Sequence, residues 1–270
     1  MKQVKALVLR AAGINCDYES VHALELAGAA ADRIHINRVI ENTDLLKEYQ
    51  ILLFPGGFSY GDDVAAGKIL ANQIVHHLSE PLTQFLADGK LMLGICNGFQ
   101  VLAKTGILPG FADDRAGNKS VTNLTEPAVS VIDNDSGKFE DRWAYLQSES
   151  EHCVFIKKGQ RIYLPVAHGE GKVVTRDESV LSKLENEDHI AFRYVDADGK
   201  VGGFPVNPNG SFNSIAGLTD STGRVLGLMP HPERFVRRTQ HPHWTRLEGD
   251  SEADGMIIFN NAVEYVKKTL

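Results

Sequence analysis

Three short runs in the first hundred residues are apolar throughout and lack the polar alternation of a strand with one face in water. They are ALVL near the N-terminus, ILLF from Ile51, and LMLGIC ending at Cys96. Strands buried on both faces have this composition, and they occur in parallel sheets covered by helices. Residues 17–28 and 79–89, which lie between these runs, have helical spacing or helix end signals. The alternation predicts an α/β fold: a doubly wound, mostly parallel sheet with helices on both faces.

The second half of the chain has a different pattern. From about Asn118 onward, short β-rich runs are broken by Gly, Asp and Pro, and DADG at residues 196–199 is a hairpin turn signal. We interpret this half as an antiparallel β extension of the same sheet, so residues 1–270 form a single domain. Apolar residues at helical spacing predict a final amphipathic helix within residues 252–270.

Charge, hydropathy and cysteine content exclude several classes of protein. The chain has 28 Lys and Arg against 35 Asp and Glu, with no basic block, so we expect no nucleic-acid partner. No apolar run approaches the length of a membrane span, and the N-terminal run resembles a first strand rather than a signal peptide. Three widely spaced cysteines imply no disulfide framework, which favours a reducing cytoplasm.

Cys96 stands where the third apolar run passes into a helical pattern. Its neighbours Gly94 and Gly98 complete the pattern Gly-x-nucleophile-x-Gly, which forms a nucleophile elbow at a strand-to-helix turn. The following helix would point its positive N-terminus at the sulfur and favour the thiolate. The backbone N–H of Asn97 would then face a developing oxyanion. The alternative is that Cys96 is a small buried core residue, as free cysteines often are.

A base for this thiol is available in the segment MPHPER. The proline after His231 favours extended backbone, in which Glu233 faces the same side and can reach the imidazole. A carboxylate on one ring nitrogen leaves the other free for the thiol. A surface turn is one alternative. Another is a metal site made of His231, Glu233, His241 and His243, but its spacing is not a strong zinc signature, and we expect no metal in this chain.

The segment FPGGFSYGDD follows the second apolar run. Its Gly56 and Gly57 would let backbone N–H groups approach a ligand, which supplies the second half of an oxyanion hole. An ordinary turn between a strand and a helix, with no role in binding, could have the same glycine pair. Of the other cysteines, Cys16 also precedes a helix but lacks flanking glycines, and Cys153 lies in a strand-like run and is expected to be structural.

These residues resemble the class I, triad-type glutamine amidotransferases, which have a flavodoxin-like fold. Five motifs occur in order, PGGFSYGD, GICNGFQ, AHGEG, NPNGS and MPHPER, and the likeness extends from GINCD to the C-terminal helix. Together they resemble the glutaminase component of phosphoribosylformylglycinamidine (FGAM) synthase. Residues 136–147 and the later HPHW resemble the glutaminase domain of the large single-chain form. Because a first strand follows Met1, we nevertheless expect a free subunit.

The resemblance implies a role for each matching position. Cys96 attacks the side-chain amide of L-glutamine, His231 moves the proton and Glu233 orients His231. The backbone N–H groups of Gly57 and Asn97 form the oxyanion hole. The residues implied in glutamine binding are Gln100, His168, Gly169 and Glu170.

The resemblance also implies partners. The chain has no phosphate-binding GxxxxGK[ST] loop, so ATP and Mg²⁺ would be used by a large synthase subunit that receives the ammonia, with a small bridging subunit in the complex. We expect no cofactor in this chain itself. Two other hypotheses remain: a stand-alone Cys-His-Glu hydrolase of γ-glutamyl or peptide substrates, and a non-catalytic module that keeps the fold.

Overall fold

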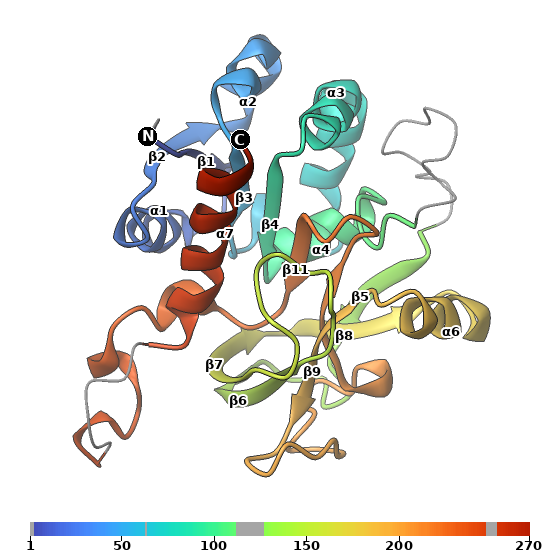
Figure 1. Ribbon diagram of the computed structural model, residues 1–270. Helices are drawn as coiled ribbons and strands as arrows, with labels where there is room; N and C mark the ends of the chain where they lie inside the picture. Colours follow the sequence, from blue (N-terminus) through green and yellow to red (C-terminus); the bar gives the residue numbers. More distant parts are fainter. Residues whose placement is uncertain (1–2, 63, 112–126, 247–252) are drawn as a thin grey trace.

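The computed structural model describes residues 3–62, 64–111, 127–246 and 253–270 (Figure 1). Its main feature is a nine-stranded sheet with the order β2-β1-β3-β4-β11-β10-β9-β6-β7. The strands are β1 (Lys5–Arg10), β2 (Ala30–His35), β3 (Ile51–Phe54), β4 (Leu91–Ile95), β6 (Glu140–Ser148), β7 (Arg161–His168), β9 (Ile190–Val195), β10 (Ile215–Thr219) and β11 (Val225–Leu228).

The first half of the sheet is parallel. Strand β1 pairs in parallel with β2 and β3, β3 with β4, and β4 with β11. All residues of β3 and β4 are buried, as their unbroken apolar composition predicted. The helices are α1 (Asp17–Leu26), α2 (Ile36–Glu41), α3 (Lys68–Ala87), α4 (Asn97–Lys104), α6 (Glu178–Asn186) and α7 (Gly255–Thr269). Helix α1 packs with α7 and α3 with α4, and Figure 1 shows the two pairs on opposite sides of the parallel strands. The predicted doubly wound arrangement is confirmed.

The second half of the sheet is antiparallel. Strands β11, β10, β9, β6 and β7 pair with alternating direction, which confirms the predicted extension. A separate two-stranded sheet, β5 (Val129–Asp133) with β8 (Glu170–Thr175), was not predicted. Residues 119–126 of the predicted β-rich segment lie outside the described residues. Buried apolar side chains of both halves form one cluster, from Val4 to Val266.

One predicted helix boundary is wrong. The serine and proline at the start of residues 79–89 predicted a helix beginning at Ser79, but α3 starts at Lys68 and contains Pro81. Its buried face runs through both parts, and the buried residues are Leu70, Ala71, Ile74, Leu78, Leu82, Phe85 and Leu86. This continuous apolar face outweighs the one backbone hydrogen bond that a proline removes. The final helix, α7, is present as predicted.

The strand order brings three chain segments to one edge of the sheet. Strands β3, β4 and β11 are neighbours and run in the same direction, so their carboxyl ends lie together. Residues 55–57, Cys96 and residues 229–233 leave the sheet at these ends. Ligands of open α/β sheets bind at this position. Among the described residues, no helix combines the length and the apolar character needed to cross a membrane.

Candidate active site

The turn at Cys96 has the geometry of a nucleophile elbow. Cys96 joins β4 to α4 with φ 51° and ψ −107°, a left-handed conformation that a non-glycine residue rarely adopts. A Cβ on Gly98 would lie 1.9 Å from the carbonyl oxygen of Phe54, and one on Gly94 would lie 2.6 Å from Leu102 Cδ1. Both glycines are therefore required by close packing of the turn against the neighbouring strand and helix.

Helix α4 directs its N-terminus at this turn. The carbonyl of Cys96 accepts from the N–H of Gln100 at 3.1 Å, which closes the first helical turn. The N–H groups of a first turn, beginning with Asn97, have no acceptor within the helix and carry partial positive charge. Cys96 is buried, and its Sγ lies 3.8 Å from the carbonyl oxygen of Ala167. The sulfur thus sits in the position that the sequence predicted for a nucleophile.

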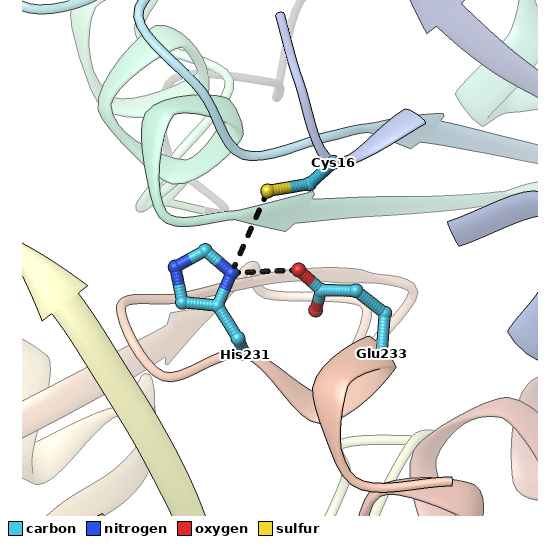
Figure 2. A group of neighbouring side chains, drawn as sticks. All are labelled: Cys16, His231 and Glu233. Carbon is cyan, nitrogen blue, oxygen red and sulfur yellow. Dashed lines mark hydrogen bonds and ion pairs between the residues drawn. The ribbon is translucent and has the colours of Figure 1, made fainter. Parts of the chain in front are cut away.

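His231 and Glu233 form a buried pair. The distance from His231 Nδ1 to Glu233 Oε1 is 2.6 Å, and both side chains are almost fully buried (Figure 2). The backbone N–H of His231 donates to the carbonyl of Pro165 in β7, which anchors the segment after β11. The predicted reason for the contact was wrong in one respect: Glu233 lies in a 3₁₀ turn, Pro232–Arg234, rather than in extended chain. The short turn brings the carboxylate back onto the ring.

The other face of this arrangement meets Cys96. A Cβ on Gly56 would lie 2.8 Å from His231 Cε1 and 3.4 Å from Cys96 Cβ, so both side chains border one point. Burial alone lowers the pKa of His231, but the Glu233 carboxylate and then the Cys96 sulfur outweigh it, and that pKa lies well above its usual value. Within the described residues no hydrogen bond reaches His231 Nε2. The structure therefore brings the predicted nucleophile, base and orienting carboxylate together.

Gly57 borders the same space. It has φ 141°, and a Cβ there would lie 2.7 Å from the backbone nitrogen of Asn15, so only glycine fits. Gly57 and Cys96 line one pocket of about 240 Å³. Asn97 lies just behind the pocket wall, where its side chain accepts from the N–H of Ser59 at 3.3 Å. The two predicted oxyanion-hole residues thus flank the candidate nucleophile.

The four residues predicted to bind glutamine all line this pocket. Gln100 Nε2 donates to the carbonyl of Glu170 at 2.6 Å, which ties α4 to the start of β8. The Glu170 carboxylate accepts from the N–H of Ala66 at 3.3 Å, and burial raises its pKa. The pocket is lined by Gly57, Phe58, Asp62, Ala66, Cys96, Gln100, Asp133, Gly137, Lys138, Phe139, Ala167, His168, Gly169 and Glu170.

His168 is held in a neutral form. Asn134 Nδ2 donates to the carbonyls of Lys138 and His168, so Asn134 Oδ1 must be the acceptor at 3.2 Å from His168 Nδ1. The ring proton therefore lies on Nδ1. Burial, and then the nearby His231, lower the pKa of His168 to about 4. His168 supports the loop through Asn134 and brings no positive charge to the pocket.

Some residues of the site were not predicted. Cys16 Sγ lies 4.0 Å from His231 Nδ1 and accepts from Arg234 Nη2 at 3.1 Å; burial raises the pKa of its thiol. GINCD had drawn attention to Cys16, but nothing in its spacing pointed to the imidazole. Phe58 and Phe139 form part of the pocket wall and remain about half exposed. Phe58 belongs to the PGGFSYGD motif but was given no role, and no local pattern marked Phe139.

Two other sequence hypotheses have structural outcomes. Within the described residues, His241 and His243 do not join His231 and Glu233 in a cluster of possible metal ligands, so the four-residue metal site is not formed. His241 packs instead against the rings of Trp143, Tyr163 and Phe235. Cys153 is buried, and burial raises its pKa to about 11, as expected of a structural thiol.

The fold and this geometry match a known family. A family model described as a CobB/CobQ-like glutamine amidotransferase domain matches residues 3–266. The chain belongs to this glutamine amidotransferase family. The class predicted from the Cys96 elbow and the His231–Glu233 pair is thereby confirmed.

Relatives narrow the position of this amidotransferase within the family. A Dehalococcoides mccartyi protein named phosphoribosylformylglycinamidine synthase subunit PurQ is 46% identical over 270 residues, covering 99% of this chain and 100% of that protein. The phosphoribosylformylglycinamidine synthase of Drosophila melanogaster is 35% identical over 277 residues, covering 98% of this chain and 20% of that protein. The structure of PurLQS from Thermotoga maritima matches with a TM-score of 0.70 and 30% identity, covering 98% of this chain and 100% of that one.

Proposed function

We propose that the chain is the glutaminase subunit of FGAM synthase. It hydrolyses L-glutamine to glutamate and ammonia. The ammonia passes to a partner subunit for the ATP-dependent conversion of formylglycinamide ribonucleotide to formylglycinamidine ribonucleotide in de novo purine biosynthesis. The observation that carries the proposal is the end-to-end likeness to a synthase subunit in a chain that retains Cys96, His231 and Glu233 in one buried site.

The first half of the reaction is an acyl transfer to sulfur. Glu233 accepts a hydrogen bond from His231 Nδ1, which leaves Nε2 to take the proton of the Cys96 thiol. The thiolate attacks the amide carbon of glutamine, and the C–N bond breaks as His231 returns the proton to the departing nitrogen. Ammonia and a γ-glutamyl thioester are the products. The raised pKa of His231 fits this role, because the imidazolium that forms beside Glu233 is stabilised.

Charge develops on the amide oxygen during this attack. The N–H groups of Asn97, at the start of α4, and of Gly57 flank the sulfur and are the proposed donors. Neither requires a side chain, so both are fixed by the backbone before substrate arrives. In the second half, a water replaces ammonia, His231 takes its proton, and hydrolysis of the thioester releases glutamate and restores Cys96.

Substrate recognition falls to the far wall of the pocket. Gln100, His168, Gly169 and Glu170 are the proposed glutamine-binding elements. The Glu170 carboxylate offers negative charge to the α-ammonium group of the amino acid, whereas the neutral His168 keeps its loop in place. A volume of about 240 Å³ suits one amino acid rather than a peptide.

The complex completes the enzyme. We propose that a large synthase subunit uses ATP and Mg²⁺ and accepts the ammonia, that a small subunit bridges the two, and that no cofactor is held by this chain. A relative's structure named PurLQS supports the complex. We place the complex in the cytoplasm, where the three free cysteines remain reduced. The relatives reported bring no support for a stand-alone hydrolase.

Reconstitution tests the proposal. The chain is mixed with a candidate large subunit, with and without the small one, and FGAM formation is measured with glutamine or with ammonium chloride as donor. The Cys96→Ala chain should lose glutamine-dependent formation and keep ammonia-dependent formation. Cys153→Ala, which alters a buried thiol away from the pocket, should keep both. Ammonia-dependent formation that disappears with Cys96→Ala would refute the division of labour.

A further inference from the structure

Cys16 reaches His231 at the ring nitrogen that Glu233 also contacts. Figure 2 shows the three side chains facing one another, with Cys16 Sγ 4.0 Å from Nδ1 and Glu233 Oε1 2.6 Å from it. They come from distant parts of the chain: Cys16 directly precedes α1, and the other two follow β11. All three are buried. The mechanism above gives Cys16 no part.

Thiolate, imidazole and carboxylate are the ligand types that zinc prefers. The three ligand atoms lie within 4.8 Å of one another. A tetrahedral zinc with ordinary bond lengths separates sulfur from nitrogen by about 3.6 Å and nitrogen from oxygen by about 3.3 Å. The separations of 4.0 and 2.6 Å therefore need to change by less than an ångström, and the sulfur–oxygen separation, at most 4.8 Å, needs to shorten by no more than about 1.2 Å.

A second observation points to a cation at this place. Glu233 Oε2 is buried and accepts no hydrogen bond from any described residue. A buried carboxylate oxygen without a partner is costly, and a metal ion within the cluster would supply one. The neighbouring Arg234 shapes the affinity in two ways. Its Nη2 donates to Cys16 Sγ, as outer groups of zinc sites do, while its positive charge disfavours permanent occupancy.

We propose that Cys16, His231 and Glu233 form a reversible inhibitory site for zinc. On binding, the Cys16 thiol releases its proton to solvent and the metal takes the Nδ1 position of His231. The proton displaced from Nδ1 moves through solvent to Nε2, so the neutral, metal-bound ring has no free nitrogen to accept the proton of Cys96. Zinc thus stops the glutaminase without touching the nucleophile. This consequence rests on the proposed function; the binding itself does not.

Cobalt is the probe for binding, because a thiolate bound to Co²⁺ gives a charge-transfer absorption band. The full-length Cys96→Ala/Cys153→Ser chain retains Cys16 as its sole thiol. One cobalt per chain, with that band, is expected, and zinc should displace it. The Cys96→Ala chain serves if the double variant does not fold. A folded chain that binds cobalt without the band, or binds none, overturns the site.

Activity of the complex tests the consequence. Zinc should abolish glutamine-dependent FGAM formation, a chelator should restore it, and ammonia-dependent formation should persist. Cys16→Ser should need about 100-fold more zinc for half-inhibition of its own zinc-free rate, since even loss of an outer-shell partner costs 10–100-fold in metal affinity. Cys153→Ser should respond as the unaltered chain does. Equal zinc sensitivity of Cys16→Ser would place zinc on Cys96 and overturn the inference. A cobalt band without any glutamine-dependent activity would instead refute the proposed function alone.

Discussion

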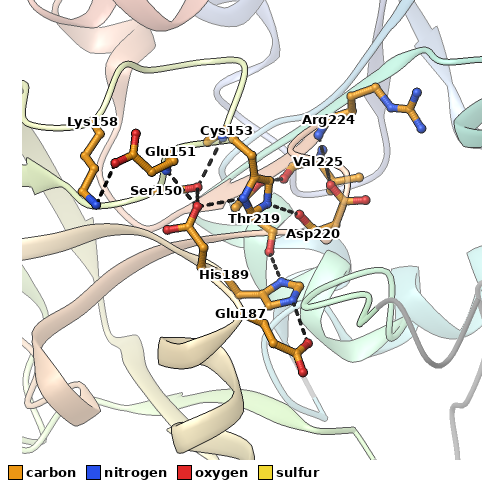
Figure 3. Close-up of polar contacts among 12 residues, drawn as sticks. Ser150, Glu151, Cys153, Lys158, Glu187, His189, Thr219, Asp220, Arg224 and Val225 are labelled. Carbon is orange, nitrogen blue, oxygen red and sulfur yellow. Dashed lines mark hydrogen bonds and ion pairs between the residues drawn. The ribbon is translucent and has the colours of Figure 1, made fainter.

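Two of the histidine–carboxylate pairs among the described residues, His231–Glu233 and His152–Asp188, differ in what the second ring nitrogen does. At the candidate active site, His231 Nδ1 contacts Glu233 at 2.6 Å and Nε2 makes no hydrogen bond within the described residues. In a second network, which includes the end of β10, His152 Nδ1 contacts Asp188 at 2.8 Å, and its Nε2 contacts the carbonyl of Asp220 at 2.9 Å. Figure 3 shows the surrounding network, including Asp220, Thr219 and His189.

The difference separates the proposed catalytic pair from a structural one. A histidine whose two nitrogens are both satisfied ties parts of the fold together, as His152 does between the residues after β6 and the turn after β10. His231 is anchored on one side only, and its other nitrogen remains available near Cys96. A carboxylate beside a histidine is therefore not sufficient to identify a base. The informative feature is a second ring nitrogen that makes no hydrogen bond and is available to accept a proton.

The largest effect is expected when the imidazole that carries the free Nε2 is removed. His231→Ala should lower the glutamine-dependent rate of the complex by at least about 10⁴-fold, because nucleophile and base act as one unit. Its ammonia-dependent rate should persist. Steady-state kinetics with both donors provide the measurement. A glutamine-dependent rate within tenfold of the unaltered chain would mean that His231 is not the base.

Glu233→Gln should have the next largest effect. The amide keeps the size of the side chain but cannot hold the Nδ1 proton as a carboxylate does, so kcat should fall by about 10³- to 10⁴-fold. The KM for glutamine should change little, because Glu233 does not line the pocket. A change confined to KM would contradict an orienting role.

The structural pair should respond in stability instead. His152→Ala removes the contacts of this side chain with the Asp188 carboxylate and the Asp220 carbonyl, so unfolding should require about 1 kcal/mol less free energy. Denaturant titration measures this, with activity below the transition as the control. Glutamine-dependent activity lost in a chain that remains folded would erase the distinction between the two pairs.

The smallest expected effect is a pH dependence of stability. The pKa of His231 is raised in the folded chain, so the stability it contributes is complete below its unfolded pKa and is lost as the pH rises through the folded value. The difference in unfolding free energy between the unaltered chain and Glu233→Gln should therefore narrow as the pH is raised from 6. A difference that widens would show that Glu233 does not hold the imidazolium.

Local sequence patterns predicted much of this fold. The apolar run that begins at Ile51 and the one that ends at Cys96 predicted buried parallel strands. The glycines on either side of Cys96 predicted the elbow. Local punctuation failed at Ser79, where a serine and a proline imitated a helix start inside the longer apolar face of α3. The small β5–β8 sheet was also missed, because pairing partners distant in sequence leave no local signal.

Contacts between residues distant in the chain could not be predicted from the sequence. Cys96 and His231 meet because β4 and β11 are neighbours in the sheet, an order that depends on the packing of the whole chain. The same packing places Cys16 beside the imidazole, a contact that no sequence motif predicted. The flanking glycines were enough to choose Cys96 over Cys16 as the nucleophile, but only the fold shows that both thiols lie near the same histidine.

The most direct test is to find which sulfur carries the glutamyl group. The complex is supplied with glutamine, quenched with acid during turnover, and mapped by mass spectrometry of its peptides. A γ-glutamyl thioester on the peptide that contains Cys96, absent in the Cys96→Ala chain, is the predicted result. The adduct on Cys16, with Cys96 unmodified, would contradict the account.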